Sequence, residues 1–246
     1  MENALLIGLS RQMALGHQMD VVANNIANLE TPGYKGETLK FEEYIMPLAQ
    51  SQDINQPTAD ISYVIDASVV RSFVTGPMKP TGNPLDIAIN GEGWFSIETP
   101  DGERYTRDGH FTLNETGTLV TDNGDPVIGE SGTFVFTPEE TGIAIASDGT
   151  ISTSAGTKGK LKIVSFENEE LMLKEGSNLF SSEAAGQTVT NPRVAQGFVE
   201  GSNVVAVTEV ARMIEVTRSY ISTAQALERL ANLKSQAIND LADVQV

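Results

Sequence analysis

From position 202 to position 246 the chain contains neither glycine nor proline, and apolar residues recur there at helical spacing. The pattern predicts one helix of about 38 residues, with Ser202 or Asn203 as its N-terminal cap. At about 1.5 Å per residue such a helix spans roughly 57 Å, which exceeds the width of a typical small domain. A compact core formed by this chain alone cannot enclose it.

The long helix carries two adjacent apolar stripes. The first consists of Val207, Val210, Ile214, Ile221 and Ala224, and the second of Met213, Val216, Tyr220, Leu227, Leu230 and Leu241. Together they form a face that is too wide for one partner helix. We expect a helix from the other end of the chain to cover part of this face and other chains to cover the remainder.

That other helix is predicted over residues 4–28. Its apolar positions at helical spacing include Leu5, Leu9, Leu15, Met19, Val22 and Ile26. It ends within residues 28–34, because Pro32 and Gly33 cannot continue a helix. Residues 35–75 show only weak patterning, and we interpret them as an extended connector.

The middle of the chain changes to the two-residue period of β-strands, as in residues 85–89 and 161–166. Turn dipeptides with glycine at 102, 109, 117, 124 and 132 divide it into short strands, which predicts an antiparallel meander with tight hairpins. No helix-length segment interrupts the rhythm, so a parallel sheet is not expected. Residues 86–190 also carry 18 acidic and 6 basic side chains, so this region is strongly acidic.

These patterns predict an α+β fold in which an antiparallel β-rich central domain is inserted between N- and C-terminal helices. The two helices are expected to pair as a coiled-coil-like domain. We place this assembly domain at residues 1–34 plus 203–246, the extended connector at 35–76 plus 190–202, and the acidic β-rich outer domain at 77–189.

Composition removes several classes of function. The formal net charge of −17 repels phosphate, so nucleic-acid binding is not expected. The chain has no cysteine, which excludes disulfides and cysteine-ligated metals. No apolar stretch approaches the roughly 18 residues that span a bilayer, so no membrane insertion is expected. Glu2 stands where a Sec-type signal peptide carries basic residues, so secretion would use another route.

No motif for catalysis or for a cofactor emerges. His17 and His110 are the only histidines, and neither has a second histidine at ligand spacing. The acidic turn at 122–125 lacks the ligand pattern of an EF-hand. Acidic pairs such as Glu139 and Glu140 point to opposite sides of an extended chain. We therefore expect no catalytic residue, no cofactor, no metal and no small-molecule substrate.

Three segments resemble the signatures of bacterial flagellar rod and hook proteins. The first is the asparagine-rich helix end of residues 23–35, Ala-Asn-Asn-Ile-Ala-Asn-Leu-Glu-Thr-Pro-Gly-Tyr-Lys. The second pairs Asn-Gly-Glu-Gly-Trp-Phe at 90–95 with Tyr-Thr-Arg-Asp-Gly-His-Phe at 105–111. The third begins with Val-Glu-Gly-Ser-Asn-Val at 199–204 and continues to Met213, Glu215, Arg218 and Tyr220. The motifs occur in the family's order and span both ends and the middle.

The resemblance implies a structural subunit of the flagellar basal-body rod, the periplasmic drive shaft, which the flagellar type III apparatus exports without a cleaved signal peptide. Its partners would be other copies of itself and neighbouring rod proteins. Length and the opening residues 1–4 favour a proximal-rod subunit, with a distal-rod subunit as the alternative. The implied assembly interface comprises Leu9, Met19, Val22, Asn24, Asn25, Ile26, Asn28, Thr31, Gly33, Val207, Val210, Ile214, Ile221 and Leu227.

Two questions stay open at this point. The polar residues between 24 and 33 could contact other subunits, or they could simply terminate the helix by bonding backbone groups. A secreted carbohydrate-binding β domain or a glycosidase would instead place the function in the middle of the chain. Such a protein has little use for two amphipathic termini, so deletion of residues 1–35 separates these alternatives.

Overall fold

The computed structural model describes the course of the chain for residues 2–46 and 61–243, and side chains for residues 5–41 and 68–239. The chain divides into two compact units. The helical unit consists of Met1–Ala27, Glu37–Arg71 and Val205–Val246, and the β unit of Asn28–Gly36 and Ser72–Val204. The chain therefore passes between the units four times. The segment after the first helix, placed from sequence with the helices, groups with the β unit.

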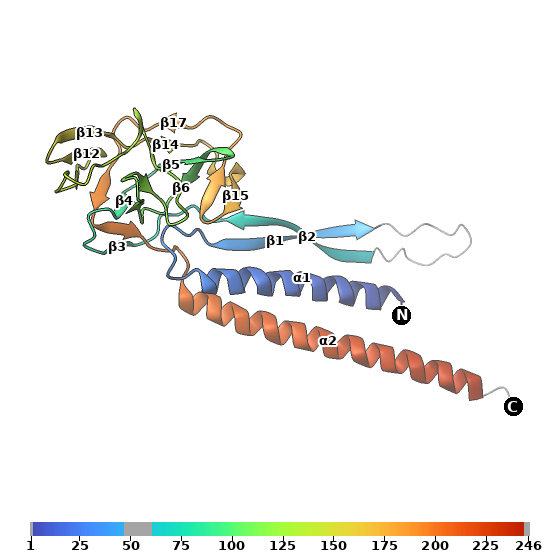
Figure 1. The fold of residues 1–246 in the computed structure, drawn as a ribbon. Helices are drawn as coiled ribbons and strands as arrows, with labels where there is room; N and C mark the ends of the chain where they lie inside the picture. Colours follow the sequence, from blue (N-terminus) through green and yellow to red (C-terminus); the bar gives the residue numbers. More distant parts are fainter. Residues whose placement is uncertain (1, 47–60, 244–246) are drawn as a thin grey trace. The chain divides into compact units, whose positions relative to one another are not determined.

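The helical unit contains two helices and one long hairpin. Helix α1 spans Glu2–Ala27 and helix α2 spans Ala206–Asp243, which is 38 residues. The two helices pack against each other and run in opposite directions, and α1 also packs against the hairpin (Figure 1). Because α2 begins at Ala206, neither Ser202 nor Asn203 is its cap, and the side chains of both bond elsewhere.

Part of the segment that we interpreted as an extended connector forms this hairpin. Strand β1 (Glu37–Met46) pairs antiparallel with strand β2 (Ile61–Arg71). The register shifts between Lys40 and Phe41, because β2 has one extra residue, Ala67, between their partners.

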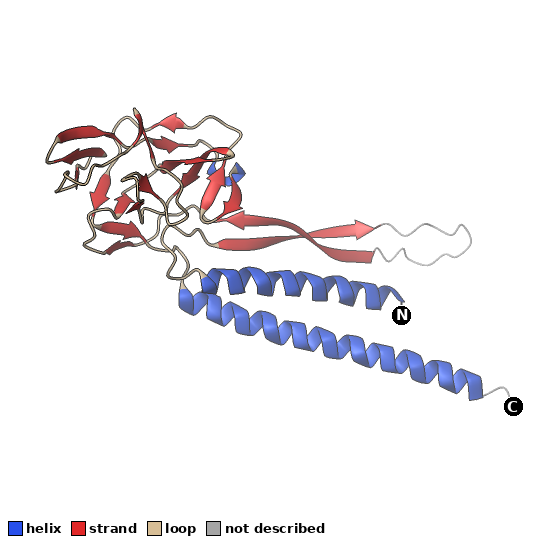
Figure 2. Cartoon of the chain, viewed as in Figure 1, coloured by secondary structure: helices blue, strands red, loops and turns tan. Residues whose placement is uncertain are grey.

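The β unit is built from short antiparallel strands (Figure 2). Six of them form its largest sheet, in the order β15-β16-β6-β5-β14-β17. The strands of the unit are β3 (Met78–Pro80), β4 (Ile87–Ile89), β5 (Trp94–Thr99), β6 (Gly102–Thr106), β7 (Thr112–Leu113), β8 (Leu119–Val120), β9 (Ile128–Gly129), β10 (Gly132–Thr133), β11 (Ala144–Ile145), β12 (Thr150–Thr153), β13 (Gly156–Lys160), β14 (Ile163–Ser165), β15 (Leu173–Gly176), β16 (Leu179–Ser181), β17 (Gln187–Thr188), β18 (Val194–Gln196) and β19 (Phe198–Glu200), with a 3₁₀ turn η1 at Glu169–Leu171. An antiparallel β-rich region between terminal helices confirms the predicted α+β fold.

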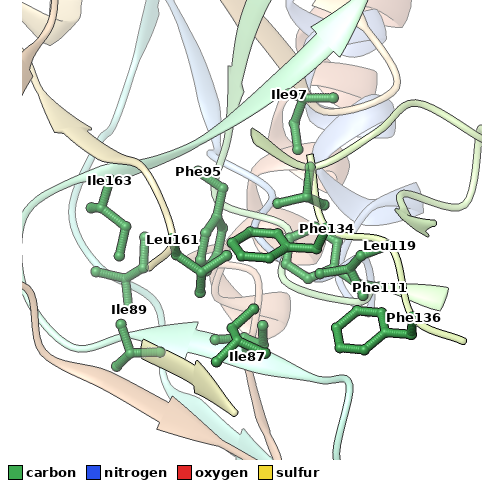
Figure 3. Packing of buried hydrophobic residues seen from close by; sticks show 13 residues of the cluster. Ile87, Ile89, Phe95, Ile97, Phe111, Leu119, Phe134, Phe136, Leu161 and Ile163 are labelled. Atoms are coloured by element: carbon green, nitrogen blue, oxygen red, sulfur yellow. The ribbon is translucent and has the colours of Figure 1, made fainter. Parts of the chain in front are cut away.

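Strand β5 lies at the centre of the β unit because both of its faces are covered. Phe95 and Ile97 point into the main cluster of buried aliphatic and aromatic side chains (Figure 3). Trp94, on the opposite face, joins a second cluster with Phe180 and Met172. Successive side chains of a strand alternate between faces, so a strand with four consecutive buried residues must be sandwiched. The β unit thus has its own complete core.

Candidate functional site

The second apolar stripe of α2 packs within the helical unit. Val216 is buried, and Met213, Tyr220 and Leu227 are half-buried. The helices are in close contact at Gly8 of α1, where a β-carbon would lie 2.4 Å from a methyl carbon of Leu227. No residue with a side chain fits there without displacing Leu227. The stripe and this glycine explain why α1 covers this side of α2.

The first apolar stripe of α2 is not covered by the chain's described residues. Val207 is 80% exposed, and Val210, Ile214 and Ile221 are 47%, 49% and 50% exposed. The four lie three, four and seven residues apart, so they form one row along the helix. We call this row the α2 stripe. Sequence predicted two stripes, and the structure shows which of them α1 leaves open.

Helix α1 also has an inner and an outer face. Val22 is buried, and Met19 and Ile26 are half-buried. The outer face carries Leu6, Leu9 and Met13, which are 51%, 50% and 59% exposed and lie three and four residues apart. Of the α1 residues predicted for the interface, Leu9 is therefore on the open face. Leu6 and Met13 were missed, although their spacing with Leu9 is visible in the sequence.

Asn25 joins three elements of the helical unit. Its side-chain amide donates to the carbonyl of Glu37 at 2.7 Å and to Oε2 of Glu209 at 3.2 Å, and its Oδ1 accepts from the amide of Glu37 at 2.9 Å. Glu209 in turn accepts from Arg212 at 2.8 Å. Asn25 is buried, whereas its neighbour Asn24 is exposed. Asn25 thus holds α1, β1 and α2 together inside one chain.

The remaining motif residues form a turn in the β unit. The hydroxyl of Thr31 donates to Oδ1 of Asn28 at 3.1 Å. Gly33 has a φ of +67° and is buried, and a β-carbon there would lie 2.3 Å from the amide nitrogen of Asp108. Its own amide donates to the carbonyl of Glu200 at 2.7 Å. Glycine is required here both by conformation and by space.

Glu200 is the centre of a buried ionic network, which we call the Glu200 network. Its carboxylate lies 2.7 Å from Nζ of Lys35 and 3.3 Å from Nη1 of Arg107, and accepts from the amide of Gly76 at 2.8 Å. Burial lowers the pKa of both Lys35 and Arg107, and the nearby Glu200 charge opposes this shift in each. Arg107 also lies 5.5 Å from the centre of the Trp94 ring. One carboxylate therefore compensates two buried cations.

Asn203 ties the same region together through uncharged hydrogen bonds. Its Oδ1 accepts from the amide of Gly36 at 2.7 Å, and its amide group donates to the carbonyls of Ser72 and Val74 at 2.7 Å and 3.0 Å. Gly36, Ser72 and Asn203 lie at or next to three of the four points where the chain passes between units. Sequence reasoning missed this role, because bonds over 129–167 positions leave no local signal.

One cluster of titratable groups lies on the β unit. Nδ1 of His110 is 2.8 Å from Oδ1 of Asp86, and the backbone amide of His110 donates to Asp108 at 3.0 Å. Burial raises the pKa of Asp108 to about 6. Burial lowers the pKa of His110. The hydrogen bond and charge of Asp86, together with the charges of Asp122 and Asp108, raise this pKa by more, so the net shift is upward.

Across the part of the chain that the structure describes, no three His, Asp or Glu side chains gather closely enough to hold a metal ion. Within the same residues, neither helix has the length and apolar character needed to cross a membrane.

Three family models match the chain in the order of its elements. Residues 5–35 match the flagella basal body rod protein family, and residues 88–153 match the D1 domain of flagellar hook protein FlgE/F/G. Residues 195–240 match the C-terminal family of flagellar basal body rod FlgEFG proteins. The models cover both helices and the centre of the β unit, which are the regions that carry the sequence motifs.

Full-length relatives agree with these models. The chain is 39% identical to the flagellar basal-body rod protein FlgF of Caulobacter vibrioides over 99% of this chain and 100% of that protein. It is 33% identical to the FlgF of Mesorhizobium japonicum over 98% of each chain, and 35% identical to the FlgG of Agrobacterium fabrum over 88% of this chain and 91% of that one. The chain therefore belongs to the family of flagellar basal-body rod proteins, as a structural subunit that resembles FlgF members along its whole length.

Proposed function

We propose that the subunit polymerises through its terminal helices, with copies of itself and with neighbouring rod proteins. The exposure of the α2 stripe is the observation that carries this proposal. A row of four aliphatic side chains, each about half exposed or more, is costly in water and marks a docking face. A contact that repeats head to tail without closing produces a helical filament, which is the form of a rod.

We further infer that the subunit acts without catalysis in the periplasmic part of the basal body, and that the flagellar type III apparatus exports it. These inferences rest on the family resemblance. The motif residues that bond inside the chain, Asn25 and Gly33, support folding in this proposal. The contact role belongs to Leu9, the α2 stripe and the exposed Asn24.

In this proposal FlgF-like subunits belong to the proximal rod and FlgG-like subunits to the distal rod. A distal-rod position is the second candidate, and the observation that keeps it open is the 35% identity to an FlgG protein. Expression of this chain in strains that lack either FlgF or FlgG separates the two. Swimming restored in the FlgF-deficient strain alone supports a proximal position, and swimming restored in the FlgG-deficient strain alone supports the distal one.

Substitution in the α2 stripe tests the assembly proposal. Ile221→Asp places a charge on the docking face, so the variant should fold its β unit yet fail to enter basal bodies. Ile221→Ala keeps the helix but removes most of the apolar contact, and should reduce incorporation less. Leu171→Asp is the matched control, because Leu171 is 75% exposed and lies in the β unit. Normal basal bodies containing the Ile221→Asp protein would contradict the proposal.

A further inference from the structure

Beside the line where α1 and α2 meet, the helical unit has a groove with a volume of about 600 Å³. Ile7 and Gly8 of α1 line one side, and Ala226, Leu227 and Leu230 of α2 line the other. From residue 218 to residue 230 the α2 side extends over roughly 18 Å. Ser219, Ser222 and Thr223 of α2 also line the groove, so its floor is apolar mainly between Gly8 and Leu230. A groove of this length accommodates about three turns of another helix.

Two arginines, Arg11 and Arg218, line the same groove. Neither has a hydrogen bond or an ion pair with any described residue. This is notable in a chain whose net charge is −17, where most cations can find a carboxylate. The groove therefore favours an apolar helix that brings a carboxylate of its own.

The outer face of α1 has this chemistry. Leu6 and Met13 lie seven residues apart in one row with Leu9 between them, and Asp20 continues the row seven residues after Met13. Asp20 is exposed, and no described residue pairs with it. From Leu6 to Asp20 the row is roughly 21 Å long, close to the length of the groove.

If a second α1 lies parallel to the first, the order of its residues matches the order of the groove residues along α2. Gly8 contacts Leu227, and the two helices run in opposite directions (Figure 1). Arg218 is therefore level with a position near residue 17 of α1. A second α1 that runs parallel to the first, displaced by about 4.5 Å along its axis, brings Asp20 to Arg218 and Met13 to Ala226.

We propose that the groove receives α1 of a second copy of this chain, with Leu6, Leu9 and Met13 on its apolar floor and Asp20 paired with Arg218. The contact uses the groove of one copy and the outer face of the next, so it is heterologous and can repeat head to tail from copy to copy. It rests on the proposed function, because it requires the helices to meet other copies. It adds which surface is the acceptor and which is the donor.

Cysteine cross-linking tests the arrangement, since the chain has no cysteine of its own. Basal bodies from a strain that carries only the Met13→Cys/Ala226→Cys protein should yield covalent dimers and larger ladders under oxidation. Either single substitution should yield none. Met13→Cys combined with Thr208→Cys is the matched control, because position 208 lies roughly 27 Å from position 226 along α2. Incorporated double-variant protein that forms no dimer, or that cross-links only to a rod protein of different mass, overturns the proposal.

Charge exchange provides a second test that needs no cross-linker. Asp20→Arg places a third cation at the groove, and Arg218→Asp alone leaves two carboxylates opposed, so each should reduce incorporation and swimming. The double variant restores an ion pair between copies and should recover both. Failure of the double variant to exceed the better single variant contradicts the pairing. If Ile221→Asp blocks assembly while both tests fail, the proposed function stands and the groove is not the acceptor.

Discussion

The two units of this chain differ in how far they bury their apolar and charged side chains. In the β unit, side chains such as Trp94 and Ile97 are fully buried, and even Lys35, Arg107 and Glu200 lie inside with partners. In the helical unit, the α2 stripe and the outer face of α1 leave aliphatic side chains in solvent. The β unit has buried clusters of its own and pairs the ions that it buries, so one copy can complete its core. The helical unit exposes aliphatic rows along two helices, and in the proposed assembly other chains cover them.

Hydrogen exchange on the isolated monomer should show the largest difference between the units. Helices with an uncovered apolar face open easily, whereas core strands open only with global unfolding, so the opening free energies should differ by about 5 kcal/mol or more. Amides of residues 5–26 and 210–239 are expected to exchange rapidly, and those of residues 85–185 slowly. Mass spectrometry of peptic fragments measures both. Equal protection of the helices and the β unit in a proven monomer would contradict the proposed difference between the two units.

Loss of the Glu200 charge should destabilise the β unit by about 3–5 kcal/mol, because it leaves two cations buried without their anion. Glu200→Gln keeps the size of the side chain and removes only its charge. Urea unfolding followed by Trp94, the single tryptophan and a fully buried one, reports this unit alone. Glu98→Gln, on an exposed carboxylate of β5, is the control. A loss below about 1 kcal/mol would mean that the network contributes little.

The stability of the β unit should fall as pH rises from about 4 to above 6.5. The folded-state pKa values of Asp108 and His110 are both raised, so both groups stabilise the fold when protonated and lose that contribution as pH passes their folded pKa. For Asp108, whose pKa is raised from 3.8 to about 6, the loss occurs between these two values and is on the order of 3 kcal/mol. Asp108→Asn should flatten this part of the profile, whereas Asp101→Asn, in an exposed turn, should not. An unchanged slope in Asp108→Asn would assign the effect to other groups.

The smallest effect is expected for the α2 stripe when stability is measured on the monomer. Ile221→Asp changes an exposed residue of the helical unit. The free energy of unfolding that Trp94 reports should therefore change by less than about 0.5 kcal/mol. The same variant is expected to abolish incorporation into basal bodies. A large loss of β-unit stability would show that assembly fails for lack of folded protein.

Periodicity predicted an element well where the spacing of its apolar residues is regular from one end to the other. The length of α2 and its two stripes follow from a spacing that no glycine or proline interrupts. The hairpin of β1 and β2 was missed because the sequence of residues 35–75 is only weakly patterned and because 14 positions separate the two strands. The turn glycines predicted the short antiparallel strands of the β unit, but not the order of the strands in its largest sheet.

The surfaces of the proposed interface follow less completely from the sequence than the fold does. Sequence spacing placed Val207 and Ile221 on a stripe, and it could not tell which stripe α1 covers. Asn25 and Gly33 belong to a motif that is easily seen, but their bonds to Glu37 and Glu200 are made inside the chain. The partners of Lys35 and Arg107 lie 165 and 93 positions away, and only the folded chain brings them together.

The four passages of the chain between its units have a mechanical consequence. A force that travels along the backbone from one unit to the other divides among four peptide segments in parallel, so each carries a fraction of it. Within the β unit, side chains of Asn203 and Glu200 bond to two of the other segments, one at Gly36 and one at Ser72 and Gly76. Several hydrogen bonds must then break together before one segment can lengthen. Four connections thus share a load that a single linker would carry alone.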